Sequence, residues 1–151
     1  MTRIAAYVAV AALVAAQAVP LAVAQTQVPQ LNPNPQTQGG ITYVSGGIAD
    51  DWQQAMESQR GQYNLHLLFA QLGTGAYFAN VPVEITDSSG RTVLSAVSQG
   101  PFFYARLQPG SYRVTATHAG QAITKTAFVG SGSGGPDLDY RWAGDGSYGN
   151  Y

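Results

Sequence analysis

From residue 64 onward, hydrophobic and polar residues alternate in a series of short segments. In one of them, Val81, Val83 and Ile85 are separated by Pro82 and Glu84. Successive side chains of a β-strand point to opposite faces of a sheet, so this alternation predicts strands with one buried and one solvated face. The strands predicted in this way span residues 64–70, 81–87, 92–98, 102–107, 111–118, 122–129 and 138–142.

Turn-forming residues separate these segments. The sequences DSSG at 87–90, QPG at 108–110 and AG at 119–120 contain the polar, proline and glycine residues that tight turns prefer. Short one-sided strands joined by such turns are typical of two antiparallel sheets packed face to face. The pattern therefore predicts a mainly β fold, an antiparallel sandwich over residues 41–142.

One segment has helical periodicity. Trp52 and Met56 fall on one face of residues 50–60 at helical spacing. Asp50 is the expected N-cap, and Gly61 is a favourable stop. We therefore expect one short amphipathic helix near 50–60, at the N-terminal end of the domain, docked through Trp52 and Met56.

The first 24 residues have the pattern of a secretory signal peptide. Arg3 precedes an apolar run over residues 4–16, and Ala22 and Ala24 form a small-residue cleavage site. Cleavage after Ala24 predicts a periplasmic or secreted protein, with an uncleaved N-terminal anchor as the alternative. Because the apolar run is shorter than the roughly 20 residues of a membrane span, no stable membrane insertion is expected after cleavage.

Two polar segments flank the predicted domain. Residues 25–40 are rich in Gln, Pro and Asn, and such a composition predicts a disordered linker. Residues 143–151 are predicted to form a disordered tail. The chain has no cysteine, which excludes disulfides and a lipid anchor on an N-terminal cysteine. The folded domain is therefore expected to depend on its hydrophobic core.

Charge argues against nucleic acid as a partner. After Ala24 the chain carries six basic and eight acidic residues, a net charge of −2. A protein that binds a phosphate backbone concentrates Lys and Arg along one surface, and these sparse charges of mixed sign form no such stripe. No nucleic-acid binding is predicted.

The residues that common enzymes need are scarce. A zinc enzyme uses about three protein ligands, whereas the only histidines are His66 and His118, both expected at the surface or at a strand end. The serines lie in turns and form no nucleophile elbow. Glu84 and Asp87 are expected to be solvated and not a glycosidase pair. No catalytic residue, metal site or cofactor is therefore predicted.

Three motifs follow one another along the predicted sandwich. They are VPVEITDSSG at 81–90, GPFF at 100–103 and LQPGSYRVTA at 107–116. Over about residues 64–130 the chain resembles the carboxypeptidase regulatory-like domain, in particular its stand-alone exported bacterial versions. The resemblance implies a seven-stranded, Ig-like or transthyretin-like sandwich. It implies no peptidase activity, because such domains are accessory modules in larger proteins.

Aromatic residues provide the candidate ligand contacts. The chain contains nine Tyr, five Phe and two Trp, and three consecutive aromatics of a strand cannot all face one core. An exposed aromatic platform could stack on sugar rings or on a hydrophobic partner; the alternative is that the aromatics fill the core and the space under the helix. The candidate residues are Phe102, Phe103, Tyr104, Tyr77 and Trp142.

Together these features predict a non-enzymatic exported module that binds or scaffolds in the cell envelope. Its partner would be an envelope protein or another copy of the chain. The alternative is a carbohydrate-binding module that uses the aromatic platform, and an enzyme with an unrecognised site is a third hypothesis.

Overall fold

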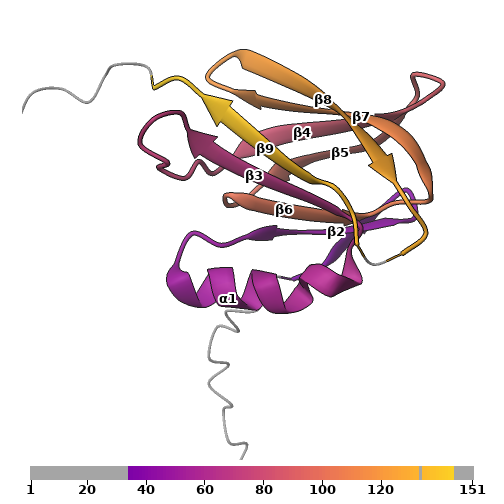
Figure 1. Cartoon of the computed structure of the whole chain (residues 1–151), viewed down its shortest axis with the longest axis horizontal. Helices are drawn as coiled ribbons and strands as arrows, with labels where there is room; N and C mark the ends of the chain where they lie inside the picture. The colour runs from indigo at the N-terminus through magenta and orange to yellow at the C-terminus, as the bar shows by residue number, and fades with distance from the viewer. Residues whose placement is uncertain (1–33, 133, 145–151) are drawn as a thin grey trace, which may run out of the picture.

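The structure, a computed structural model, describes residues 34–132 and 134–144. Over these residues the chain is mainly β, as predicted: two sheets lie face to face, and one short helix covers the outer side of one sheet (Figure 1). The predicted signal peptide lies outside the described residues, as do most of the predicted linker and tail.

The larger sheet has five strands in the order β1-β2-β6-β3-β9. Their bounds are Gln36–Gln38 for β1, Ile41–Gly46 for β2, Phe102–Arg106 for β6, Leu65–Gln71 for β3 and Asp137–Trp142 for β9. The smaller sheet has four strands in the order β5-β4-β7-β8. Their bounds are Thr92–Ser98 for β5, Val81–Asp87 for β4, Gly110–His118 for β7 and Gln121–Val129 for β8.

The described residues form nine strands, and the expected number of seven is wrong. The two additional strands are the β1–β2 hairpin, and β1 lies inside the segment 25–40 that was predicted to be a disordered linker. Gly39 and Gly40 have φ angles of 57° and 81°, as a tight two-residue hairpin turn requires. The composition of this segment does not indicate a strand, because the residues of β1 are polar and pair with β2 through backbone groups.

The sheets are also not wholly antiparallel. β9 pairs with β3 in parallel, in a register that runs from His66 opposite Asp137 to Gln71 opposite Trp142. After β8 the chain crosses from the smaller sheet to the larger one, and β9 therefore starts at the same end as β3 (Figure 1). The alternation of hydrophobic and polar residues predicts that 138–142 is a strand. It does not predict whether that strand runs parallel or antiparallel to its neighbour, which depends on the crossover.

The helix α1 spans Asp50–Gln59 and continues into a 3₁₀ turn, η1, over Arg60–Gln62. The helix was predicted within a residue, but its N-cap is Ala49 and not Asp50. Asp50 instead lies in the first turn, where a carboxylate favours the positive end of the helix dipole. Met56 is fully buried against the larger sheet, as predicted.

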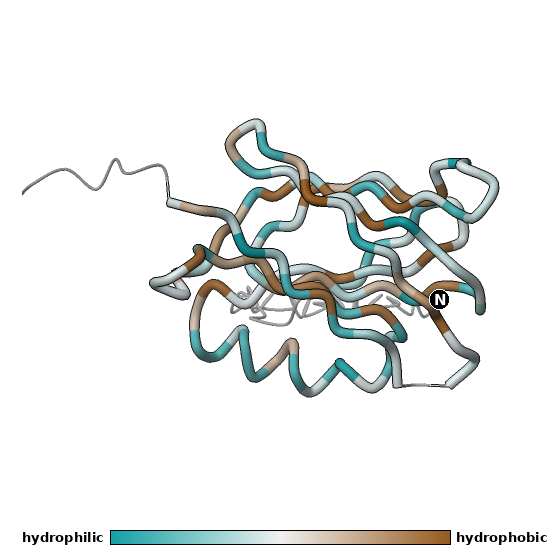
Figure 2. The backbone as a smooth tube through the Cα atoms, turned by 45° about the horizontal axis from the view of Figure 1, so that its top comes forward, coloured by the Kyte–Doolittle hydropathy of each residue, from teal (hydrophilic) through white to brown (hydrophobic). Residues whose placement is uncertain are grey.

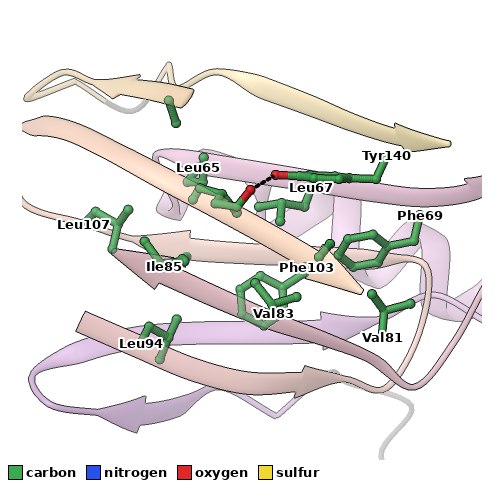
Figure 3. Packing of buried hydrophobic residues seen from close by; sticks show 14 of the residues in the cluster. Leu65, Leu67, Phe69, Val81, Val83, Ile85, Leu94, Phe103, Leu107 and Tyr140 are labelled. Carbon is green, nitrogen blue, oxygen red and sulfur yellow. Dashed lines mark hydrogen bonds between the residues drawn. The ribbon is translucent and has the colours of Figure 1, made fainter. Parts of the chain in front are cut away.

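The hydrophobic core lies between the two sheets. Hydrophobic positions recur along the strands, whereas α1 is mostly hydrophilic (Figure 2). The predicted inward residues of two central strands are at most 2% exposed and point into the core (Figure 3): Leu65, Leu67 and Phe69 on β3, and Val81, Val83 and Ile85 on β4. The predicted strand faces are confirmed for these positions.

Both edge strands of the smaller sheet make side-chain contacts with residues of the larger sheet. On β5, the backbone N–H of Ser95 donates a hydrogen bond to the side-chain carbonyl of Gln38 (2.9 Å). On β8, the ammonium of Lys125, the chain's only lysine, lies 5.5 Å from the centre of the Tyr140 ring of β9. The edge strands of the smaller sheet are thus tied to the larger sheet.

One buried hydrogen bond connects the two sheets through the core. The hydroxyl of Tyr140 on β9 donates to the backbone carbonyl of Val114 on β7 at 2.7 Å (Figure 3). Tyr140 is fully buried, and burial raises the pKa of its hydroxyl well above the ordinary value because the phenolate form would lose its hydration.

Stability is therefore expected to fall at strongly alkaline pH. Below about pH 10 the tyrosine is protonated in the folded and unfolded chains alike, and its contribution is complete. Above that pH the unfolded chain releases a proton that the folded chain keeps, so the free energy of unfolding decreases by about 1.4 kcal/mol per pH unit for this group. Urea unfolding at neutral and alkaline pH measures the decline. Tyr140→Phe should lower the free energy of unfolding by about 1 kcal/mol at neutral pH, and that free energy should then fall less steeply with pH than in the original protein. Equal pH dependence in both proteins would contradict this role.

Candidate functional site

The five candidate aromatics do not form a platform. Phe103 and Trp142 belong to the core, Tyr104 lies under α1, and each is at most 2% exposed. The expectation that these three contact a ligand is therefore wrong for this conformation. Both faces of β6 are covered, one by the smaller sheet and the other by α1, which buries Phe103 and Tyr104; Trp142, on β9, belongs to the core between the sheets. This corresponds to the alternative in which the aromatics fill the core and the space under the helix.

Two of the candidates remain accessible. Tyr77, in the loop between β3 and β4, is 49% exposed, and Phe102 is half-buried. Their ring centres are 5.9 Å apart and the rings are tilted by 56°. The Phe102 ring also lies against Gly47, since a Cβ at Gly47 would fall 2.3 Å from that ring. The exposed Ile48 follows Gly47, so an apolar patch of Ile48, Tyr77 and Phe102 lies beside the helix N-terminus.

His66 is less accessible than predicted, whereas His118 lies at the end of β7, as predicted. His66 is buried under α1, because the outward face of β3 is covered there and not solvated. Its ring meets the Tyr104 ring edge-on, with centres 4.9 Å apart. His118 is half-buried and stacks on Phe78 at 3.8 Å between ring centres. Within the described part of the chain, no cluster of three His, Cys, Asp or Glu residues could hold a metal ion.

A polar cluster fastens the end of α1 to the larger sheet. Arg60 forms an ion pair and hydrogen bond with Asp137 at the start of β9. His66 donates from Nε2 to the carbonyl oxygen of Arg60 (3.0 Å), and its Nδ1 lies 3.3 Å from Oδ1 of Asp137. Burial raises the pKa of the neighbouring Tyr104 hydroxyl. Because the cluster joins η1, β3 and β9 and its histidine is buried, we interpret it as structural.

An open polar depression of about 630 Å³ lies at one end of the smaller sheet. Its volume is within the range of small-molecule sites, which is roughly 300–1,000 Å³. The β4–β5 turn forms one wall, and the start of β7 and the end of β8 form the other. The lining residues are Thr86, Asp87, Ser88, Ser89, Gly90, Ser111, Tyr112, Arg113 and Thr126.

The β4–β5 turn is held in place by Asp87. One carboxylate oxygen of Asp87 accepts hydrogen bonds from the Ser89 hydroxyl and from the backbone N–H groups of Ser89 and Arg91, and the Arg91 guanidinium lies 3.4 Å from the other oxygen. The bonds from Ser89 and Arg91 hold the pKa of Asp87 below its ordinary value, the Ser89 hydroxyl first among them. Gly90 has a φ of 85°, which favours glycine at this corner. The wall of the depression is thus built by local turn chemistry.

A row of three cross-strand partners forms the floor. Arg113 on β7 lies opposite Thr86 on β4 and opposite Thr126 on β8. Neighbouring strands are about 4.8 Å apart, so Arg113 lies between two residues that carry a hydroxyl. The residues next to Arg113 and Thr126 in sequence include the buried Val114 and Ala127, and the row therefore faces away from the core. No described element covers it.

A second hollow, of about 420 Å³, is less available for binding. In its lining, Arg106 donates to the carbonyl of Gln62 (2.9 Å). The side chain of Asn64 both donates to the carbonyl of Leu107 and accepts from its N–H, at 2.7 Å in each case. These polar groups are already used to close the fold, whereas those of the first depression are largely free.

Comparison with known proteins does not assign the chain to a family. No family model matches the chain, and a search of curated proteins also finds no match. The resemblance to the carboxypeptidase regulatory-like domain therefore stays a prediction. No helix formed by the described residues has the length and hydrophobicity of a membrane span.

The depression was not predicted from the sequence. Because side chains alternate along a strand, Arg113 lies on the opposite face from Tyr112 and Val114, but nothing in the sequence shows that β4 and β8 are its neighbours. The available signal was the turn DSSG at 87–90 together with the hydroxyl residues Ser111 and Thr126 of two later strands.

Proposed function

We propose that this chain is a non-enzymatic module, exported from the cytoplasm, that binds a ligand or partner of the cell envelope. Its export rests on the signal-peptide pattern of residues 1–24. Its assignment to the carboxypeptidase regulatory-like domains, with an Ig-like or transthyretin-like sandwich, is part of the same proposal. The order of the turn motifs at 81–90 and 107–116 and the two-sheet architecture support it.

The observation that carries the binding role is the polar depression between the β4–β5 turn and strands β7 and β8. It combines an open volume, free hydroxyl groups and a charged side chain on a scaffold whose core is filled. Sites built on the strands of a rigid scaffold hold their groups in place before a ligand arrives. A hydroxyl-rich ligand, such as a glycan of the envelope, matches this lining better than a lipid or a hydrophobic peptide.

A second candidate is a protein partner at the apolar patch of Ile48, Tyr77 and Phe102. Ile48 is 61% exposed and Tyr77 is 49% exposed. Exposed aromatic and aliphatic side chains that lie together are typical of protein-binding surfaces. Of these residues only Phe102 belongs to a strand, at the start of β6 in the larger sheet, and none of the three lines the polar depression.

Site-specific photo-crosslinking in the native cell distinguishes the two surfaces. A photoreactive amino acid is placed at position 126 in the depression, at position 77 in the apolar patch, or at position 54 as a control. Gln54 is an exposed residue of α1 outside both surfaces. We expect adducts with envelope material from position 126 at a higher yield than from position 54. Stronger adducts from position 77 would favour the protein partner, and equal yields from all three positions would contradict a specific binding role.

A further inference from the structure

We propose that the polar depression is a receptor site for a carboxylated saccharide, in which Arg113 binds the carboxylate and the surrounding hydroxyls bind the sugar. This inference rests on the proposed binding function and names its ligand class. It follows from which polar groups of the protein are already paired and which are not.

Arg113 differs from the other arginines that the structure describes. Each of the others has a partner: Arg60 pairs with Asp137, Arg91 with Asp87, Arg141 with Asp139, and Arg106 donates to the carbonyl of Gln62. Among residues 34–132 and 134–144, Arg113 alone of the arginines forms no ion pair or side-chain hydrogen bond. A guanidinium has five N–H donors in a planar fork that matches a carboxylate in a bidentate pair.

The acidic residue of the depression does not supply that partner. Asp87 already accepts three hydrogen bonds from its own turn and faces the guanidinium of Arg91. The nearest other acid on this face is Glu84, which lies one row away from Arg113, opposite Thr115. No ion pair links Glu84 to Arg113 within the described residues. The depression therefore offers an anion one unused cation.

The free hydroxyls point to a sugar and not to a simple anion. The side chains of Thr86, Ser88, Ser111 and Thr126 form no hydrogen bond to other described residues, and all four line the depression. Each hydroxyl can donate one hydrogen bond and accept others, which is the complement of a ring that carries several hydroxyls. The hydroxyl of Tyr112 donates to the carbonyl of Gln108 (2.7 Å), so that ring is fixed in the wall.

The same observations argue against a nucleic acid. Binding to a phosphate backbone requires several neutralising cations along a track. The depression has one unpaired cation and a neighbouring carboxylate, and the chain as a whole is slightly acidic. A ligand with one carboxylate on a hydroxyl-rich ring matches a site with one unpaired cation and several free hydroxyls.

The test uses a matched pair of ligands and the purified full-length protein. Digalacturonate carries carboxylates, and its methyl ester has the same ring hydroxyls without the charge. By titration calorimetry or by NMR shifts, we expect the acid to bind at least about tenfold more tightly than the ester, in line with the usual strength of a charged hydrogen-bonded pair. Added salt should weaken binding of the acid and leave that of the ester nearly unchanged.

Three variants locate the site. Arg113→Gln should weaken digalacturonate binding about tenfold or more, and Arg113→Lys should restore part of it, because lysine keeps the charge without the bidentate fork. Glu84→Gln should strengthen binding about twofold, since it removes a like charge near the carboxylate. Arg141→Gln is the control: this arginine lies on β9 of the other sheet and pairs with Asp139, so binding should not change. An unchanged melting temperature shows that each variant is folded.

Several results would overturn the inference. Equal binding of acid and ester, or full binding by Arg113→Gln, would exclude the guanidinium as the recognition group. Competition by inorganic phosphate or acetate at the same concentration as digalacturonate would reduce the site to a simple anion site. If digalacturonate does not bind but position 126 still forms envelope adducts, the ligand class is wrong and the binding function stands. If both fail, the proposed function fails as well.

Discussion

Replacing Phe103 with alanine is expected to lower the free energy of unfolding by about 3–5 kcal/mol, the usual loss for a buried phenylalanine. Phe103 lies in the core on β6, is 0% exposed, and stacks on Tyr43 of β2 with ring centres 5.4 Å apart. Its removal leaves a cavity between the sheets. Since a domain of this size has about 5–15 kcal/mol of total stability, the variant should unfold at a much lower urea concentration.

Phe128 provides a matched control for this substitution. It is also a phenylalanine on a strand, β8, but it is 76% exposed. Phe128→Ala is expected to change stability by less than about 0.5 kcal/mol, as is usual for exposed positions. Similar losses in both variants would mean that Phe103 is not a core residue. The comparison also matters for binding studies, because a loss of ligand binding in Phe103→Ala would reflect unfolding and not a lost contact.

The second large effect is expected for Gly100→Ala. Gly100 precedes β6 and packs against the backbone of β2: an added Cβ would lie 2.4 Å from the carbonyl carbon and oxygen of Gly46. Backbone atoms in a paired strand have little room to move, so the β5–β6 turn must shift away from β2. We expect a loss of about 3 kcal/mol, at the upper end of ordinary overpacking effects.

Gly130→Ala tests whether this loss is specific to the close approach. Gly130 follows β8, is exposed, and an added Cβ would meet nothing within 4 Å. Thermal unfolding of the two variants should show a large decrease in melting temperature for Gly100→Ala and almost none for Gly130→Ala. A Gly100→Ala protein as stable as the control would show that the turn can move at little cost.

The strands from β3 to β9 and the helix could be predicted from the sequence because their signals are local. The alternation around Val83 and the spacing of Trp52 and Met56 depend only on which face of a single element is buried. The β1–β2 hairpin could not be predicted in the same way. Its first strand is fully polar and exposed, so its pairing depends on the backbone and on the turn at Gly39 and Gly40.

The candidate site depended on information that a single strand does not contain. His66 was expected at the surface because it faces away from the core, and for Tyr104 exposure and burial under the helix were both open; α1 docks on that side, and both residues are buried. Alternation along β7 is enough to place Arg113 on the outward face, but its importance comes from its neighbours on two other strands. Burial by a second layer and adjacency across strands both follow from tertiary structure, and neither leaves a periodic pattern in the sequence.

The contacts of Gln38 and Lys125 at the edges of the smaller sheet have a consequence for how copies of the chain behave at high local concentration. An edge strand with free backbone groups can recruit a strand from another molecule, which leads to domain swapping or fibrils. Here the N–H of Ser95 on one edge is already bonded to Gln38, and the other edge carries an inward-facing lysine, a residue that natural sheets use against such recruitment. These contacts disfavour strand addition at both edges of the smaller sheet, although the chain has no disulfide to hold those edges in place.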